Sequence, residues 1–147
     1  MDYLDWYKGK NVLITGHTGF KGSWLAIWLK MLGARVFGVG LEPEGETLFE
    51  SSRIGTLLEG SYYADIRDYS RIKNIIRDIR PSVVFHLAAE AIVGRSYKFP
   101  KETWATNVMG TLNIAEILRE ELNKECSAVF VTSDKCYENK EWTWGYR

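Results

Sequence analysis

The chain has 147 residues, of which 46% are hydrophobic and 26% are charged, a composition that favours one globular domain with a proper core and excludes a disordered chain. Its 19 Lys and Arg balance its 19 Asp and Glu, so no net charge favours nucleic acid or an anionic membrane surface as a partner. A phosphate-bearing ligand must therefore be held by local contacts.

Strand-like and helix-like segments alternate along the chain, with no internal repeat. Apolar runs predict strands at 11–15, 35–39, near 62–64, at 82–87 and at 128–132. Helical spacing predicts helices at 23–32, 68–79 and 103–123, with Asp68 as an N-cap and Pro81 as a terminator. Because parallel strands need covering crossover helices, this order predicts an α/β fold, a Rossmann-like parallel sheet of about five strands with helices on both faces.

Each predicted helix has apolar positions that we expect to pack in the core. In the first helix they are Trp24, Leu25, Ile27, Trp28, Met31 and Leu32. In the second they are Ile72, Ile75, Ile76 and Ile79. In the third they are Val108, Leu112, Ala115, Leu118 and Leu122.

The N-terminal residues carry no targeting pattern, since no basic stretch precedes an apolar one, and no apolar run approaches the length needed to span a bilayer. We therefore expect a cytoplasmic protein with no membrane partner. The two cysteines, Cys126 and Cys136, make neither a disulfide framework nor a metal-ligand cluster. We expect both to be free thiols and expect no metal site.

A glycine pattern follows the first predicted strand and leads into the first predicted helix. Gly16 permits a tight turn, Gly19 lets the backbone approach a pyrophosphate, and Gly22 lets the helix pack on the strand with its N-terminus toward the phosphates. This position between strand and helix favours a dinucleotide-binding site over a purely structural turn. Lys21 either assists phosphate binding or is a solvated loop charge.

The residues that would distinguish NAD from NADP are ambiguous. The second strand ends without the acidic residue at its tip that normally receives an adenosine ribose hydroxyl. Glu42 either serves this purpose or is a solvated loop residue. Asp65, after the third strand, either accepts a hydrogen bond from the adenine amino group or caps the following turn.

A hydroxyl, a carboxylate and an amine stand side by side just after the fifth predicted strand, at Ser133, Asp134 and Lys135. They are either acid–base groups of a sugar-modifying enzyme or a solvated strand end. At this point the chain resembles the extended short-chain dehydrogenase/reductase superfamily, whose motifs it matches in order at 15–25, 86–89, 106–111 and 132–135. Within that superfamily it is similar to the CDP-glucose 4,6-dehydratases, through Lys21 in the glycine loop and the stretches 48–50, 95–97 and 134–147.

The resemblance implies a nucleotide-sugar enzyme that binds NAD and takes CDP-glucose as its substrate, in deoxysugar synthesis for surface polysaccharides such as the lipopolysaccharide O-antigen. The sugar is oxidised at C4, loses water across C5 and C6, and is reduced at C6. Ser133 would hydrogen-bond the C4 oxygen, Asp134 would protonate the departing C6 hydroxyl, and Lys135 would handle the C5 proton. The residues implied to bind the cofactor are Gly16, Thr18, Gly19, Phe20, Lys21, Gly22, Asp65, Ile66, Leu87, Ala88, Ala89, Asn107 and Thr132.

The superfamily's Tyr-x-x-x-Lys helix, which provides the base for C4 oxidation, is expected after the fifth strand and is not found before Arg147. We therefore expect residues 1–147 to be an NAD-binding Rossmann domain cut before that helix and the substrate domain. By itself this domain should be inactive, whereas the full-length form should be a homo-oligomer. The alternatives are another nucleotide-sugar epimerase or reductase of the superfamily, or a catalytically silent NAD-binding module.

Overall fold

The computed structural model describes residues 3–122, 125–133 and 136–145. Its strands are β1 (Asn11–Thr15), β2 (Arg35–Gly40), β3 (Gly60–Tyr63), β4 (Val83–His86) and β5 (Ser127–Phe130). They form one five-stranded sheet in the order β3-β2-β1-β4-β5, and every neighbouring pair is parallel. The predicted parallel sheet is confirmed, and its strand order reverses direction between β1 and β4.

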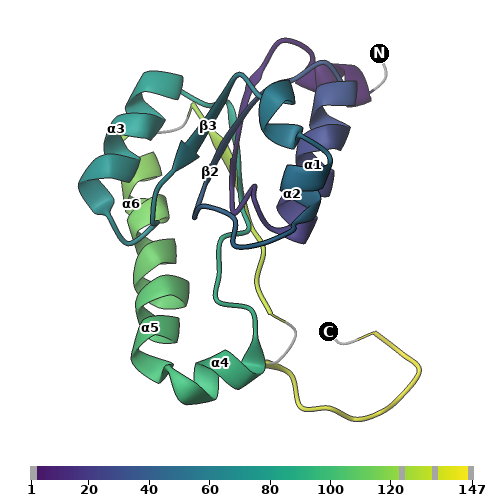
Figure 1. Ribbon diagram of the computed structural model, residues 1–147, viewed down its shortest axis with the longest axis vertical. Helices are drawn as coiled ribbons and strands as arrows, with labels where there is room; N and C mark the ends of the chain where they lie inside the picture. The colour runs from purple at the N-terminus through teal and green to yellow at the C-terminus, as the bar shows by residue number, and fades with distance from the viewer. Residues whose placement is uncertain (1–2, 123–124, 134–135, 146–147) are drawn as a thin grey trace.

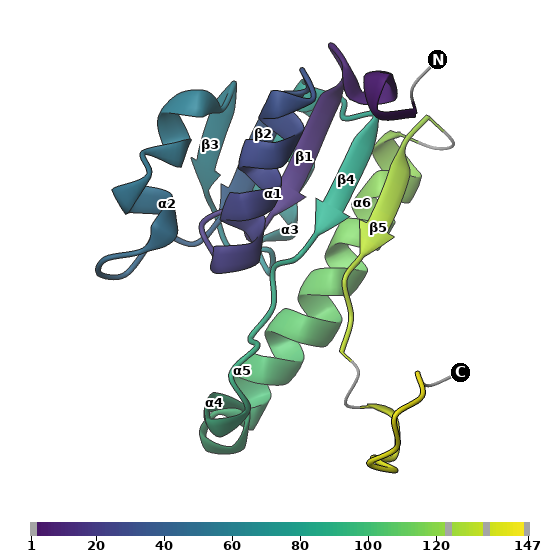
Figure 2. The same cartoon turned by 90° about the vertical axis from the view of Figure 1, so that its right-hand side faces the viewer.

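Helices cover both faces of this sheet, as predicted. The α-helices are α1 (Phe20–Met31), α2 (Leu48–Ser51), α3 (Tyr69–Ile79), α4 (Val93–Lys98), α5 (Pro100–Trp104) and α6 (Thr111–Glu121). Shorter segments are the 3-10 helices η1 (Tyr3–Tyr7) and η2 (Ile54–Leu57) and the π-helix η3 (Ala105–Gly110). In Figures 1 and 2, α3 and α6 lie on one face of the sheet, while α1 and α2 lie on the other.

The central strand β1 contributes to two cores because alternate side chains of a strand point to opposite faces. Leu13 belongs to the core under α3 and α6, whereas Val12 and Ile14 belong to the core under α1 and α2. All three side chains are fully buried. A continuous apolar run is typical of a parallel strand that is covered on both faces, which is why this strand was recognisable in the sequence.

The helix α3 agrees with its prediction in both ends and in its buried face. The Asp68 side chain accepts a hydrogen bond from the Arg71 backbone N–H at 3.0 Å, which satisfies one free donor of the first turn. Arg80 ends the helix in the left-handed conformation, directly before Pro81. The residues buried by α3 are Ile72, Ile75, Ile76 and Ile79.

The helix α1 packs through its small side chains, so the prediction for its packing face is wrong in part. Its buried residues are Gly22, Ser23, Ala26 and Leu29. Trp24, Trp28 and Met31, which we expected in the core, are 53%, 56% and 80% exposed. Small side chains let the helix backbone approach the sheet closely, and the large apolar residues are left on the outer side.

The long helix predicted at 103–123 begins earlier, at Pro100, and α5, η3 and α6 follow one another without a break. Its buried apolar residues are Ile114, Ile117, Leu118 and Leu122. Val108 and Leu112 are 45% and 54% exposed, and Ala115 is exposed as well, so the predicted face is wrong at these positions. The wider turns of η3 shift the phase of the residues before α6, which a uniform α-helical spacing could not anticipate.

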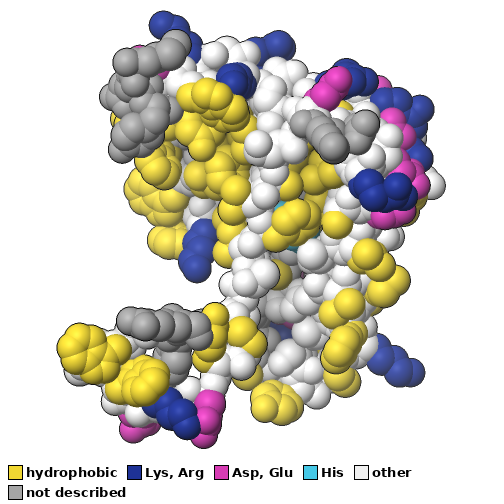
Figure 3. Space-filling view, turned by 180° about the vertical axis from the view of Figure 1, so that it is seen from behind, with side chains coloured by type: hydrophobic (Ala, Val, Ile, Leu, Met, Phe, Trp, Pro, Cys, Tyr) yellow, Lys and Arg dark blue, Asp and Glu magenta, His cyan; other side chains and the backbone are white. Residues whose placement is uncertain are grey.

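The α4–α5 segment projects beyond the carboxyl ends of the strands, and the chain after β5 runs in the same direction (Figures 1 and 2). Seen from behind, apolar side chains are exposed on both the body of the domain and the projecting part, with a hollow between the two (Figure 3). The large exposed side chains of the projecting part include Ile92, Tyr97, Trp104, Trp142 and Trp144. Within the described ranges, no helix combines the length and the apolar character that crossing a membrane would require.

Candidate functional site

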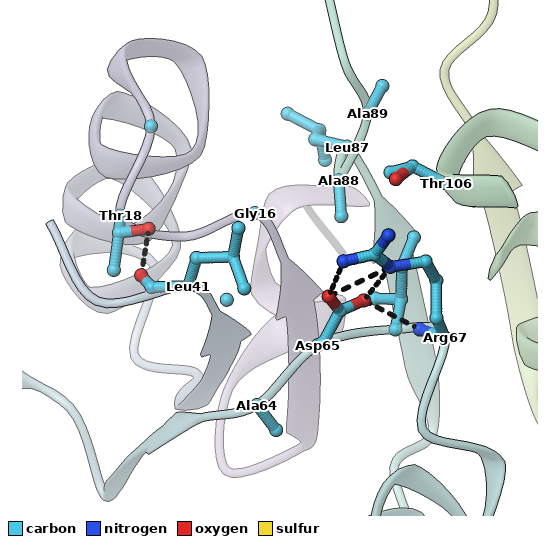
Figure 4. Close-up of a pocket in the computed structure, with 13 residues that line it drawn as sticks. Gly16, Thr18, Leu41, Ala64, Asp65, Arg67, Leu87, Ala88, Ala89 and Thr106 are labelled. Carbon is cyan, nitrogen blue, oxygen red and sulfur yellow. Dashed lines mark hydrogen bonds and ion pairs between the residues drawn. The ribbon is translucent and has the colours of Figure 1, made fainter. Parts of the chain in front are cut away.

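A cleft lies at the carboxyl ends of β1, β2, β3 and β4, close to the reversal of strand order (Figure 4). Open parallel sheets bind their ligands at such a switch point. The cleft is lined by Gly16, Thr18, Gly19, Gly40, Leu41, Ala64, Asp65, Ile66, Arg67, Leu87, Ala88, Ala89 and Thr106. Apart from Gly40, the last residue of β2, and Thr106 of η3, these residues come from the β1–α1 loop and from the segments that follow β2, β3 and β4.

Gly16 in the β1–α1 loop and Gly22 in the first turn of α1 are positions that accept only glycine. Gly16 has a φ of +74°, and a Cβ there would lie 2.8 Å from the backbone nitrogen of Ala88. A Cβ on Gly22 would lie 2.1 Å from the carbonyl oxygen of Gly16. The absence of both side chains therefore lets the loop bend back on α1 and approach the end of β4.

The N-terminus of α1 faces this loop with no side chain to cap it. Its N-cap is Gly19, whose backbone is extended, with φ −78° and ψ 166°. The first N–H groups of a helix have no partner within the helix, and their dipoles favour an anion. This arrangement suits a pyrophosphate, as the glycine spacing predicts.

Two side chains of the loop join it to β2 and β3. The Thr18 hydroxyl donates to the Leu41 carbonyl at 3.0 Å. Nε2 of His17 lies 2.7 Å from the Ser61 hydroxyl, and the His17 ring, which is fully buried, packs edge-to-face on Phe49 with 5.1 Å between ring centroids. Burial lowers the pKa of His17, because desolvation disfavours the charged imidazole. His17 is a positioning residue that the glycine spacing did not reveal.

His86 connects three elements beneath the cleft. Its Nδ1 lies 2.7 Å from the Thr15 hydroxyl, and its Nε2 lies 3.0 Å from the Thr111 hydroxyl. The Thr15 oxygen also accepts a hydrogen bond from the Ala88 backbone N–H at 3.2 Å. Burial lowers the pKa of His86 from 6.5 to about 4, so the ring is neutral at pH 7. If the Thr15 hydroxyl donates to Nδ1 of the neutral ring, the proton of the ring is on Nε2, which then donates to the Thr111 hydroxyl.

Asp65 and Arg67, which follow β3, form an ion pair in the lining of the cleft (Figure 4). Oδ1 of Asp65 accepts from the Arg67 backbone N–H at 2.8 Å and from Nε at 3.0 Å, and Oδ2 accepts from Nη2 at 2.5 Å. Hydrogen bonding by Arg67 lowers the pKa of the Asp65 carboxyl. The backbone contact is the turn-capping role that we considered for Asp65. Arg67 itself was missed, although the Asp-x-Arg spacing after a strand could have indicated a turn closed by an ion pair.

Asn107, in η3, fixes the backbone that leaves β4. Its Oδ1 accepts from the Glu90 N–H at 2.7 Å and its Nδ2 donates to the Glu90 carbonyl at 3.0 Å. The Glu90 carboxylate in turn accepts from Arg95 at 2.8 Å. Asn107 thus bonds the helix to the sheet edge, and it acts on Ala88 and Ala89 through the backbone rather than by lining the cleft.

The structure places the predicted binding residues in two groups. Those that line the cleft are Gly16, Thr18, Gly19, Asp65, Ile66, Leu87, Ala88 and Ala89. Those that lie outside its lining are Phe20, Lys21, Gly22, Asn107 and Thr132. Ser133 is exposed after β5, and Asp134 and Lys135 lie outside the described residues. The lining residues that sequence reasoning missed are Gly40, Leu41, Ala64, Arg67 and Thr106.

Two tyrosines in the chain have a lysine four residues later, and both pairs lie away from the cleft. Tyr69 and Lys73, in α3, bind the Glu120 carboxylate of α6 at 2.8 Å and 2.7 Å. Tyr97 is 85% exposed on α4, and Lys101 belongs to the next helix. Neither pair is therefore the oxidation base that the resemblance implies.

Comparison with known proteins adds sequence relatives and structural neighbours. A CDP-glucose 4,6-dehydratase of Salmonella typhimurium is 48% identical over 144 residues, which cover 97% of this chain and 40% of that protein. A GDP-mannose 4,6-dehydratase of Yersinia enterocolitica is 31% identical over 119 residues, 75% of this chain and 31% of that protein. The chain thus spans well under half the length of these relatives.

Among solved structures, a UDP-glucose 4-epimerase from Stenotrophomonas maltophila, which holds NAD and a formylated UDP-arabinopyranose, has a TM-score of 0.76 at 27% identity. The match covers 91% of this chain and 40% of that one. The sequence profile described as GDP-mannose 4,6 dehydratase matches residues 13–141, which hold the last three residues of β1, the other four strands and every residue of the cleft. On that match, the chain belongs to the GDP-mannose 4,6 dehydratase family.

Proposed function

We propose that these residues form the NAD-binding part of a nucleotide-sugar 4,6-dehydratase that converts CDP-glucose to CDP-4-keto-6-deoxyglucose. The observation that carries the proposal is the 48% identity to the Salmonella CDP-glucose 4,6-dehydratase, which extends over 97% of this chain and so includes the whole cleft. The GDP-mannose 4,6-dehydratase of Yersinia is only 31% identical, which favours CDP-glucose over GDP-mannose.

The residues of the cleft fit NAD. The bend at Gly16 and the N–H groups that start α1 suit a pyrophosphate, and the small side chains of Ala88 and Ala89 leave room for a nicotinamide ribose. Asp65 is suited to accept from the adenine amino group. Among the described residues lining the cleft, the one cation is Arg67, which is already paired with Asp65, so nothing there is set aside for the 2′-phosphate of NADP.

When bound, NAD would supply a reversible hydride acceptor for the sugar. The chain's own residues would hold the sugar and move its protons. Ser133 would donate a hydrogen bond to the C4 oxygen, Asp134 would protonate the leaving C6 hydroxyl, and Lys135 would take the C5 proton. The pairing of β5 with β4 in parallel supports this, because residues that follow the two strands emerge at one edge of the sheet. An amine base needs a lowered pKa, which burial or the neighbouring nicotinamide would provide.

We assign the activity to the full-length protein, since the chain spans 40% of the Salmonella relative. We further propose that the full-length protein is a cytoplasmic homo-oligomer, with neither nucleic acid nor a membrane as a partner. The balance of 19 basic and 19 acidic residues supports the last point. The exposed apolar residues of η3 and α6, Val108, Met109 and Leu112, support an oligomer, because such a stripe is suited to contact a second subunit.

The test uses the purified full-length protein with NAD and three separate substrates: CDP-glucose, GDP-mannose and UDP-glucose. Mass spectrometry of each product reports loss of one water, and sugar analysis reports inversion at C4. We expect water loss from CDP-glucose, with kcat/KM about 100-fold or more above that for GDP-mannose. Preference for GDP-mannose would overturn the substrate assignment. Inversion at C4 without water loss would favour the epimerase alternative.

A further inference from the structure

The carboxylate that is best placed to bind the adenine amino group, that of Asp65, already accepts hydrogen bonds from Arg67. Asp65 is the one carboxylate among the described residues that line the cleft, and the guanidinium of Arg67 lies against it there (Figure 4). Asp65 is 29% exposed and Arg67 is 45% exposed, so both remain within reach of a ligand.

The geometry of the pair leaves little acceptor capacity on the carboxylate. Oδ1 accepts from the Arg67 N–H and Nε, at 2.8 Å and 3.0 Å. Oδ2 accepts from Nε and Nη2, at 2.9 Å and 2.5 Å. The single Nε–H is shared between the two oxygens, so three N–H donors of Arg67 occupy most of the roughly four acceptor sites of the carboxylate. An amino group that approaches Asp65 therefore competes with the guanidinium donors.

Hydrogen bonds and packing hold the backbone around Asp65 and Arg67 in place. The Arg67 side chain is therefore the group that can move when a ligand approaches Asp65. Nδ2 of Asn113 donates to the carbonyls of Ile66 and Arg67, at 3.1 Å and 3.3 Å. Ile66 is 4% exposed and packs against Gly110, where a Cβ would lie 2.5 Å from its Cδ1. The Asp65–Arg67 turn is thus anchored to η3 and α6. Of the residues that line the cleft, Asp65 is the one that binds the guanidinium.

We propose that Arg67 tunes adenine recognition, because its guanidinium competes with the adenine amino group for the Asp65 carboxylate. This inference rests on the proposed function, in which NAD occupies the cleft. Exposed ion pairs contribute little to stability, so the adenine amino group can still displace Arg67 from Asp65. The free energy needed to break the ion pair nevertheless lowers the affinity for the adenine end of NAD. Arg67 then sets how tightly the adenine end of the cofactor is held.

The test compares two dinucleotides in the full-length protein freed of cofactor. One is NAD, and the other is its analogue with purine in place of adenine, which lacks only the amino group. Dissociation constants are measured by calorimetry for the unchanged protein, Arg67→Met, Asp65→Ala and the double variant. Arg71→Met is the matched control, because it removes the same charge from the same region outside the cleft, where Arg71 donates to the Tyr63 carbonyl at 2.8 Å.

The ratio of the two dissociation constants isolates the amino group, since a loss of positive charge weakens both dinucleotides alike. We expect Arg67→Met to raise the preference for NAD over the purine analogue by about three- to fivefold, the scale of an exposed ion pair. Arg71→Met should leave that preference unchanged, and Arg67→Met should have no effect on it in the Asp65→Ala background.

An unchanged or lower preference for NAD in Arg67→Met would overturn the inference while leaving NAD as the ligand. A rise of equal size in Arg71→Met would also overturn it, because general charge would then be the cause. If the unchanged protein binds neither dinucleotide, the proposed function fails, and the inference fails with it.

Discussion

The hydroxyl of Thr15 lies 2.7 Å from Nδ1 of His86, and this contact joins the carboxyl ends of β1 and β4 at the switch point of the sheet. The same oxygen accepts from the Ala88 N–H at the cleft. Protonation of Nδ1 would turn this acceptor into a donor, so the Thr15 hydroxyl could no longer donate to the ring. The stability of the domain should therefore depend on pH through His86.

The first prediction concerns that dependence. Burial lowers the pKa of His86 from 6.5 to about 4, so between these values the unfolded chain binds a proton that the folded chain does not. The free energy of unfolding should fall as pH falls through this range, by about 3 kcal/mol from His86. His17, whose pKa burial also lowers, adds to the fall.

The measurement is urea unfolding of the unchanged protein and His86→Gln at several pH values between 7 and about 4. Glutamine keeps an acceptor and a donor but does not titrate. We expect the variant to be less stable at pH 7 and to show a shallower slope with pH. Identical slopes would mean that His86 does not titrate between folded and unfolded states as its burial implies.

A second prediction concerns Gly22. Alanine there would place a Cβ 2.1 Å from the Gly16 carbonyl oxygen, so the loop must move. We expect Gly22→Ala to lower the free energy of unfolding by about 1–3 kcal/mol and to weaken NAD binding at least tenfold. Thermal unfolding and NAD titration check both. Gly94→Ala is the control, because nothing lies within 4 Å of a Cβ at that α4 position; an equal loss there would contradict the steric explanation.

A third prediction concerns Asn107, which makes two hydrogen bonds to the Glu90 backbone. Asn107→Ala should cost about 1–3 kcal/mol of stability, because a partly buried N–H and carbonyl lose their partners. NAD affinity should fall as well, since the backbone of Ala88 and Ala89 loses its support. Asn107→Asp keeps the acceptor for the Glu90 N–H and should lose less. If alanine and aspartate behave alike, the paired contact is not what holds this segment.

A fourth prediction concerns Asp134 and Lys135 in the full-length protein. Asp134→Asn removes the proposed acid, and Lys135→Met removes the proposed base, so each should slow elimination by about 10²–10⁴. Oxidation at C4 and NAD binding should persist. Single-turnover absorbance of reduced nicotinamide, together with solvent exchange at C5, separates these steps. Variants that turn over at the native rate, or that fail only because NAD no longer binds, would show that the two residues are structural.

The strands and the glycine loop were predictable because local sequence determines them. A buried parallel strand needs a continuous apolar run, and Gly16 and Gly22 occupy positions that no other residue can take. The outer face of α1 was not predictable in the same way. Trp24 and Trp28 repeat at helical spacing, but spacing does not tell which face meets the sheet, and the smaller Ala26 packs there instead.

The site residues that belong to a sequence motif could be predicted, whereas those whose role depends on tertiary contacts could not. Asp65 and Ile66 were identified, yet Arg67 was missed because its role depends on a side-chain fork that closes a turn. His17 was hidden in the glycine loop, since only the approach of Ser61 from β3 reveals its hydrogen bond. The π-turns around Asn107 were also missed, because no residue type marks them.

The dehydratase assignment is tested by following one hydrogen isotope through the reaction. The full-length protein is supplied with NAD and CDP-glucose that carries deuterium at C4, and the product is analysed by NMR and mass spectrometry. A 4,6-dehydratase oxidises C4, eliminates water across C5 and C6, and reduces C6 in one active site. We expect CDP-4-keto-6-deoxyglucose with the deuterium at C6. Deuterium retained at C4 of a sugar that has lost no water would contradict the dehydratase assignment.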